Sequence, residues 1–182
     1  IMSVPMLFNK VYDGVQKAVS EGSAAKKSLF SAAMKVSRER NHLLEFGKPV
    51  GAWLDFKHKL ADKIIFSKIR DRLGGRLRFM SAGGAATSVE VLEFFEDIGI
   101  SICEGYGLTE TAPVISSSGC GWKTRRIGTV GVPLPGVTMY IRDPETGAEL
   151  PADTDGEICV AGRNVMKGYR NNEAANEEVF FQ

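Results

Sequence analysis

Apolar residues recur at helical spacing along the first part of the chain. Residues 1–5 form a short strand-like run that ends at a proline. The apolar positions that follow recur every three or four residues and predict a helix: Leu7, Val11, Val15 and Ala18. Gly22 is a stop signal for that helix. The chain is therefore expected to open with a short strand and an amphipathic helix.

Two further helices are predicted before the first glycine-rich loop. Ser23 can cap a helix that runs to about Phe46, and the Gly-Lys-Pro sequence at residues 47–49 breaks it. A third helix ends at residues 74–75 and carries an apolar stripe at Trp53, Leu60, Ile64 and Ile69. A tryptophan and an aliphatic stripe at this spacing are typical of a buried face, so we expect these side chains to belong to the core.

Residues 77–111 predict an α/β unit. A strand at residues 77–81 leads into the loop Gly83-Gly84-Ala85, and a second strand at residues 100–103 leads into residues 104–111. In an open α/β sheet, ligands bind at loops that follow the carboxyl ends of strands, and both loops occupy that position. The alternative for residues 83–84 alone is a sharp turn with no ligand.

A helix is expected between these two strands. Thr87 and Glu90 have the spacing of a capping box, which predicts a helix from there through Ile98, and Gly99 ends it.

The residue pattern of the chain changes after residues 116–119. Turn residues become frequent, and short strand-like runs lie between them at residues 137–142 and 157–161. Residues 172–181 are expected to form a short helix or a connection. We therefore predict an α/β subdomain at residues 1–118 and a β-rich subdomain, a distorted barrel, at residues 119–182. Gly162 and Gly168 have the character of barrel-corner or bulge glycines.

The sequence Glu104-Gly105-Tyr106-Gly107-Leu108-Thr109-Glu110-Thr111 carries the strongest chemical signal. Glycines let a backbone approach a ligand closely, and Tyr106 between them offers a flat face for a base. Thr109 can donate a hydrogen bond to a phosphate or carbonyl oxygen, and the Glu110 carboxylate suits Mg²⁺. These groups are what a nucleotide-activating enzyme needs. A tight strand-to-helix turn without chemistry is the alternative for these residues alone.

The same residues resemble the Tyr-Gly-x-Thr-Glu signature of the adenylate-forming superfamily, which includes acyl-CoA synthetases, peptide-synthetase adenylation domains and luciferases. Gly83-Gly84-Ala85 is similar to that family's Gly-Gly-Ala loop. Residues 156–162 and 165–169 are similar to its Gly-Glu … Gly … Gly-Tyr motif. The three motifs occur in the family's order, and the N-terminal part is most similar to long-chain fatty acid–CoA ligases.

The resemblance implies a parent enzyme that forms an acyl-adenylate from a fatty acid and ATP, then passes the acyl group to coenzyme A. It implies catalytic roles for Thr109 and Glu110, with Glu110 as the Mg²⁺ ligand. It places the ATP or AMP at these residues: Gly83, Gly84, Ala85, Glu104, Gly105, Tyr106, Gly107, Leu108 and Thr109. The alternatives are a fatty acyl-AMP ligase or a peptide-synthetase adenylation domain. A non-catalytic nucleotide-binding or interaction module is the alternative from another class.

Three parts that the resemblance implies are not found in this sequence. They are a Ser/Thr/Gly-rich loop ending in Lys, a Thr-Gly-Asp motif for the ribose, and a C-terminal domain with a catalytic Lys. We therefore expect a central fragment of a larger AMP-binding domain, which is inactive by itself and self-associates through exposed edges. Glu157 is expected to pair with a basic neighbour or the backbone. Lys123, Arg125 and Arg126 are expected to lie on a solvated loop rather than reach a phosphate.

Charge is distributed unevenly along the 182 residues. Residues 1–79 hold 16 of the 23 Lys and Arg but only 7 of the 22 Asp and Glu. This basic half is consistent with solvated helix faces or with peripheral contact to an anionic membrane, and no nucleic-acid partner is expected. Three cysteines without a CxxC pair indicate neither a zinc site nor a disulfide framework. A reducing, cytoplasmic setting is therefore expected.

Overall fold

The computed structural model describes residues 1–119, 121 and 125–180, and these residues divide into two compact units. The first unit comprises residues 1–105 and 118–131. The second comprises residues 106–117 and 132–182. Each unit contains both helix and strand, so the predicted α/β fold class is confirmed. The division into subdomains at residue 118 stays a prediction.

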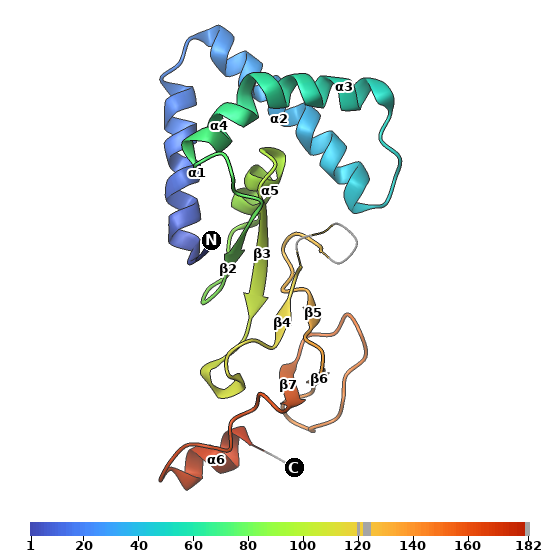
Figure 1. Cartoon of the computed structure of the whole chain (residues 1–182). Helices are drawn as coiled ribbons and strands as arrows, with labels where there is room; N and C mark the ends of the chain where they lie inside the picture. The colour runs from blue at the N-terminus through green and yellow to red at the C-terminus, as the bar shows by residue number, and fades with distance from the viewer. Residues whose placement is uncertain (120, 122–124, 181–182) are drawn as a thin grey trace. The chain divides into compact units, whose positions relative to one another are not determined.

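The sheet of the first unit is parallel. Strands β1 (Met2–Ser3), β2 (Phe79–Ala82) and β3 (Ser101–Tyr106) lie in that order. Figure 1 shows β2 beside β3. In the β2–β3 pair, Phe79 is opposite Ser101 and Ala82 is opposite Glu104. Both strands therefore end at the same edge of the sheet, as expected for the strand–loop–helix–strand unit.

Helices α1 (Pro5–Ser20) and α2 (Ala24–Glu45) follow the predicted bounds closely. Pro5 begins α1 at a position where its missing N–H costs no helical hydrogen bond. The Ser23 hydroxyl caps α2 by accepting a hydrogen bond from the Lys26 amide at 3.3 Å. Gly47 then leaves the helix with a φ of 64°, a conformation that favours glycine.

The core of the first unit is built around α5 (Val89–Asp97). Phe94 and Phe95 of this helix are almost fully buried. The Phe95 ring packs edge-on against Phe8 of α1, with ring centroids 6.0 Å apart. Ile98 and Ile100, which connect α5 to β3, are also fully buried. Burial of these side chains holds α1 and α5 together as one layer over the strands.

The third predicted helix differs from its expectation. It consists of α3 (Ala52–Ala61), a π-helical turn η1 (Asp62–Phe66) and α4 (Ser67–Arg72). The Ser67 amide bonds to the Asp62 carbonyl, so one residue is added to the turn and the helical phase shifts. Phe66 consequently enters the core, whereas Trp53 remains 67% exposed.

The prediction that the stripe on this helix is buried was therefore wrong for its first three members. Leu60 and Ile64 are exposed like Trp53, and only Ile69 packs against the core, partly buried. Trp53 and Leu60 lie in α3, before the π turn, so the turn does not explain their exposure. Helical spacing shows which residues share a face, but not whether that face meets another element of the fold.

The cap of α5 also differs from the predicted one. Ser88, and not Thr87, is the N-cap, and its hydroxyl accepts a hydrogen bond from the Val91 amide. Glu90 accepts a hydrogen bond from the Tyr12 hydroxyl instead of closing a capping box. Thr87 is buried and its amide bonds to Glu104, which holds it outside the helix.

The second unit contains short antiparallel strand pairs. Strand β4 (Ser116–Ser117) pairs with β5 (Val132–Pro133), and β6 (Val137–Arg142) pairs with β7 (Glu157–Gly162). The two longer strands match the predicted runs, and α6 (Glu173–Val179) matches the predicted helix. Within the part of the chain that the structure describes these sheets are open, so the expected barrel does not close. Glu157 accepts a hydrogen bond from Arg142, its opposite residue across the pair, as predicted.

The cysteines depart from expectation at one position. Cys103 is disulfide-bonded, although the spacing of the cysteines indicated no disulfide, while Cys159 is a buried free thiol. Cys120 lies outside the described residues. Among the described residues there is no cluster of three or more His, Cys, Asp or Glu side chains that could hold a metal ion. No described helix combines the length and apolar character needed to cross a membrane.

Asp97, at the end of α5, is a buried carboxylate, and its burial predicts a pH-dependent stability. Its side chain is 2% exposed and accepts hydrogen bonds from Arg38 and Asn41. Burial raises its pKa to about 6, although the Arg38 charge opposes the shift. The folded protein therefore holds a proton that the unfolded chain has already released, and stability falls as pH rises from about 4 to 6.

We predict that Asp97→Asn removes this pH dependence and stabilises the fold above pH 6, by up to about 3 kcal/mol for a shift of about two pKa units. Urea denaturation of both proteins between pH 4 and 7 measures the effect. Equal slopes of unfolding free energy against pH in the two proteins would show that Asp97 does not titrate in this range.

Candidate functional site

The first glycine-rich loop leaves the carboxyl end of β2, next to the end of β3. Because Ala82 is opposite Glu104 in the sheet, Gly83 lies beside Gly105. A Cβ at Gly83 would sit 3.8 Å from the Gly105 carbonyl oxygen, which is ordinary contact. Gly84 has a φ of 83°, which other residues rarely adopt, and both Gly84 and Ala85 are exposed. The loop therefore presents its backbone at the edge where ligands bind in open α/β sheets.

Glu104 ties this loop to the end of β3. Its carboxylate accepts a hydrogen bond from the Thr87 amide, at 3.3 Å. Its own amide donates to the Ser118 hydroxyl at 2.8 Å, and its carbonyl accepts from the Ser118 amide at 2.9 Å. Burial raises the pKa of Glu104, and the hydrogen bonds with Thr87 oppose the shift. The side chain thus holds the end of the first loop, at Thr87, against the end of β3, a role that the sequence motif did not suggest.

Arg125 corrects another expectation in the same unit. Its side chain is 3% exposed, whereas a solvated loop was predicted. It forms an ion pair with Glu96 of α5 and also donates to the Ile102 carbonyl of β3. Its charge is therefore paired inside the unit. Lys123, with which it was grouped, lies outside the described residues.

The second glycine-rich loop, in the second unit, closes tightly on itself. A Cβ on Gly107 would fall 1.7 Å from the Pro113 carbonyl oxygen, so no other residue fits without moving the backbone. The Ile115 amide donates to the Tyr106 carbonyl at 2.8 Å across the base of the loop. Gly107 is therefore required by the packing of the loop itself, in addition to any ligand.

A short 3₁₀ turn, η2 (Thr109–Thr111), shapes the tip of this loop. The buried Thr111 hydroxyl accepts from the Leu108 amide at 3.0 Å, and Asn164 donates to the Thr111 carbonyl at 2.9 Å. With Thr111 turned inward, Leu108 and Thr109 are exposed. The turn therefore leaves the Thr109 hydroxyl accessible, as its predicted hydrogen bond to a ligand oxygen requires.

Glu110 is held by the segment that precedes α6. Its carbonyl accepts from the Met166 amide at 2.7 Å, and its carboxylate accepts from the Tyr169 hydroxyl. The hydrogen bond with Tyr169 lowers the pKa of Glu110, so the carboxylate is ionised at neutral pH. One oxygen is engaged by Tyr169, and the carboxylate keeps further lone pairs for a cation.

Tyr169 is fixed in turn by α6. The Tyr169 amide donates to the Asn176 side chain at 2.6 Å, and that side chain donates back to the Tyr169 carbonyl at 2.9 Å. Gly168, with a φ of 136°, leaves room for Asn176, since a Cβ there would lie 2.8 Å from its amide oxygen. Sequence reasoning assigned no role to Tyr169, although the residue ends one of the recognised motifs.

The predicted site residues divide between the two units. Residues 83–85, 104 and 105 belong to the first unit, and residues 106–110 belong to the second. An ionised carboxylate is the ligand that a hard cation such as Mg²⁺ prefers, so Glu110 fits the metal role. Glu110 would supply one ligand, and Mg²⁺ usually takes its others from substrate phosphates and water.

Comparisons with known proteins identify the family to which the chain belongs. The model of the family described as AMP-binding enzyme matches residues 1–170. The chain is 37% identical to Long chain acyl-CoA synthetase 7, peroxisomal, from Arabidopsis thaliana, over 97% of this chain and 24% of that protein. It is 34% identical to Long-chain-fatty-acid--[acyl-carrier-protein] ligase AEE15, chloroplastic, of the same organism, over 98% of this chain and 28% of that protein.

Solved structures show the same likeness. The chain resembles ATP-bound MatB from Rhodopseudomonas palustris with a TM-score of 0.54 and 34% identity, over 61% of this chain and 22% of that one. The chain thus spans about a quarter of the length of the relatives that it matches. Since the family model covers nearly all of the sequence and both glycine-rich loops, the chain belongs to the AMP-binding enzyme family.

Proposed function

We propose that the chain forms the central part of an AMP-forming long-chain fatty acid–CoA ligase. The observation that carries the proposal is the loop at residues 104–111, which exposes Thr109 and holds an ionised Glu110. The 37% identity to a long-chain acyl-CoA synthetase over 97% of the chain supports this substrate class. The substrates are then ATP, a long-chain fatty acid and coenzyme A.

In this proposal the residues act by positioning and electrostatics. The fatty acid carboxylate attacks the α-phosphate of ATP, pyrophosphate leaves, and an acyl-adenylate forms. The exposed Thr109 hydroxyl donates a hydrogen bond to the α-phosphate or to the substrate carboxylate. Glu110 would hold Mg²⁺ together with the ATP phosphates, and the metal would supply positive charge next to them. The backbone at residues 83–85 and 104–105 and the Tyr106 ring form the adenine side of the site.

A carrier-protein thiol is the second candidate for the acyl acceptor. The chain is 34% identical to a protein named as an acyl-carrier-protein ligase and 37% identical to a CoA synthetase. These two identities are similar, so they favour neither acceptor. The adenylation half of the reaction is the same for both acceptors. Supplying coenzyme A or an acyl carrier protein to a preformed acyl-adenylate distinguishes the two. If the chain were a non-catalytic nucleotide-binding module, no acyl-adenylate would form even when the chain is part of a longer protein.

We predict that Glu110→Ala, in the full-length enzyme, lowers the rate of acyl-adenylate formation about a hundredfold, because one electrostatic stabiliser of the phosphates is lost. The measurement is pyrophosphate release with ATP, Mg²⁺ and palmitate. Glu177→Ala, which removes an exposed carboxylate from α6 in the same unit, is the matched control and should keep the wild-type rate. Wild-type pyrophosphate release by a folded Glu110→Ala enzyme would exclude the metal role.

Tyr169→Phe should have a smaller effect with a distinctive pH profile. Loss of the hydrogen bond to a charged group should lower the rate about tenfold. The hydrogen bond from Tyr169 is the main cause of the lowered pKa of Glu110. Without this bond, Glu110 takes up a proton at higher pH. The acid limb of the rate profile should therefore move to higher pH, and higher Mg²⁺ should partly restore the rate. An unshifted acid limb would indicate that Tyr169 only packs.

This chain by itself should form no acyl-adenylate. The proposed reaction also needs a phosphate-binding Lys, a ribose-binding Asp and a mobile catalytic Lys, and motifs for these are not found in the 182 residues. Groups that act as a unit lose far more than their share when the others are missing. The purified chain, incubated with ATP, Mg²⁺ and a long-chain fatty acid, should release pyrophosphate at the no-protein rate. Clear turnover would show that the assigned roles are wrong.

A further inference from the structure

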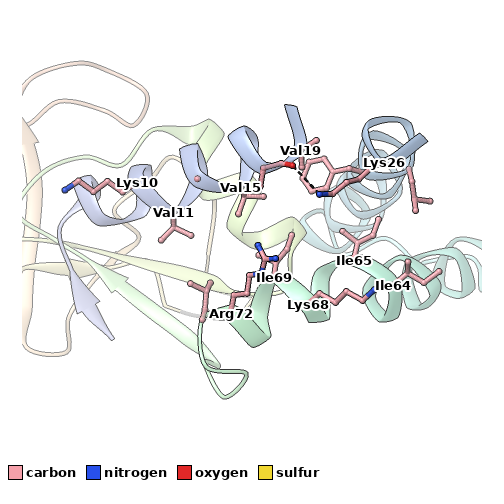
Figure 2. Close-up of a pocket in the computed structure, with 15 residues that line it drawn as sticks. Lys10, Val11, Val15, Val19, Lys26, Ile64, Ile65, Lys68, Ile69 and Arg72 are labelled. Carbon is pink, nitrogen blue, oxygen red and sulfur yellow. Dashed lines mark hydrogen bonds between the residues drawn. The ribbon is translucent and has the colours of Figure 1, made fainter. Parts of the chain in front are cut away.

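An apolar cavity of about 490 Å³ lies among the helices of the first unit, between α1, α2 and the η1–α4 segment (Figure 2). Its volume is within the usual range for a small-molecule site. Its walls are mainly aliphatic side chains from two facing segments: Val11, Val15 and Val19 of α1, and Ile64, Ile65 and Ile69 of η1 and α4. None of its lining residues belongs to the two glycine-rich loops.

The cavity exists because small residues occupy the middle of α1. Gly14 and Ala18 line it, and a Cβ built on Gly14 would meet no atom within 4 Å. Glycine inside a helix is less favourable than alanine by about 1 kcal/mol, because it loses more backbone freedom on folding. A larger residue at position 14 would improve the helix and fill the space. The sequence thus keeps a gap that helix stability alone would close.

The π-helical turn shapes the opposite wall. Its phase shift sends Phe66 into the core, while the adjacent Ile64 and Ile65 line the cavity. Ile64 is 40% exposed despite its aliphatic side chain. Apolar surface that faces an open space instead of a neighbouring side chain gains by accepting an apolar ligand.

The rim of the cavity is uniformly basic. Lys10, Lys26, Lys68 and Arg72 contribute to the lining, and all four side chains are exposed. The lining includes no Asp or Glu. Arg70, a neighbour on α4, is paired with Asp62, whereas neither Lys68 nor Arg72 forms an ion pair with any of the described residues. An anionic group at this rim would find cations and no acidic competitor.

We propose that the cavity binds one long-chain carboxylate, apart from the two glycine-rich loops, with the hydrocarbon chain between α1 and the η1–α4 segment and the head group at Lys68 and Arg72. An aliphatic interior with a one-sign cationic rim matches a single-chain amphiphile with an anionic head. A neutral lipid would leave the rim unused. This site goes beyond the proposed adenylation function, because it uses none of the residues that contact ATP in that proposal.

Titration of the 182-residue chain with laurate, by isothermal calorimetry without ATP, tests the proposal. We expect saturable binding of one laurate per chain. Shortening the ligand by two methylenes, to decanoate, should raise the dissociation constant on the order of tenfold. Methyl laurate, which lacks the charge, should bind more weakly than laurate, and Lys68→Gln with Arg72→Gln should remove that difference.

Two substitutions at one position separate the cavity from the stability of the helix. Gly14→Leu fills the space and should abolish laurate binding, whereas Gly14→Ala favours the helix equally and should retain it. Thermal unfolding should show both variants at least as stable as the wild type, which verifies that they fold. Glu110→Ala should bind laurate normally, so failure of the adenylation proposal leaves this test intact.

Two results would overturn the proposal. One is equal laurate binding by folded Gly14→Leu and Gly14→Ala. The other is an absence of saturable laurate binding together with sedimentation of the chain on phosphatidylglycerol vesicles that Gly14→Leu does not change. The second result would identify the basic rim as a membrane-contact surface and not as a fatty acid site.

Discussion

The parallel pairing of β2 with β3 is the constraint on which the first unit's part of the site depends. Because Ala82 is opposite Glu104 in the sheet, both strands end at the same edge. The Glu104 carboxylate accepts a hydrogen bond from the Thr87 amide, on the far side of the first loop. A shift of one residue in this register would turn every side chain of a strand to the other face. It would also separate Gly83 from Gly105. The burial of Phe94, Phe95 and Ile98 in the connection between the strands opposes such a shift.

The second unit uses a hydrogen-bonded relay to hold its acidic residue. Asn176 fixes Tyr169, Tyr169 bonds to Glu110, and the 3₁₀ turn with its inward Thr111 fixes the backbone at that point. Each member is a polar group whose partner is also restrained, so the carboxylate is held before any ligand arrives. Such preorganisation is what electrostatic catalysis requires, because the protein does not have to rearrange as charge develops.

The first unit combines a dense core with an underfilled helical layer. On one side of α1, Phe8 packs edge-on against Phe95 with almost no exposure. Along another part of the same helix, Gly14 and Ala18 leave a space that η1 and α4 do not fill. This space is open to solvent on one side, so its apolar lining, including Ile64, stays in contact with water, which is unfavourable. A ligand that occupies the space would remove that contact.

The order of helices and strands, the α/β class and both glycine-rich loops could be predicted from the sequence, because periodicity, glycines and caps act over a few residues. Ser23, Gly47 and Gly99 have the positions that local chemistry predicts. Three features could not be predicted without the folded structure: Ser88 replaces Thr87 as a cap, Arg125 is buried against Glu96, and Tyr169 holds Glu110. These outcomes depend on partners that lie 17, 29 and 59 residues away along the chain, respectively. Residue spacing likewise did not show that Phe66 is buried and Trp53 exposed, because burial depends on which neighbouring elements a helix face meets.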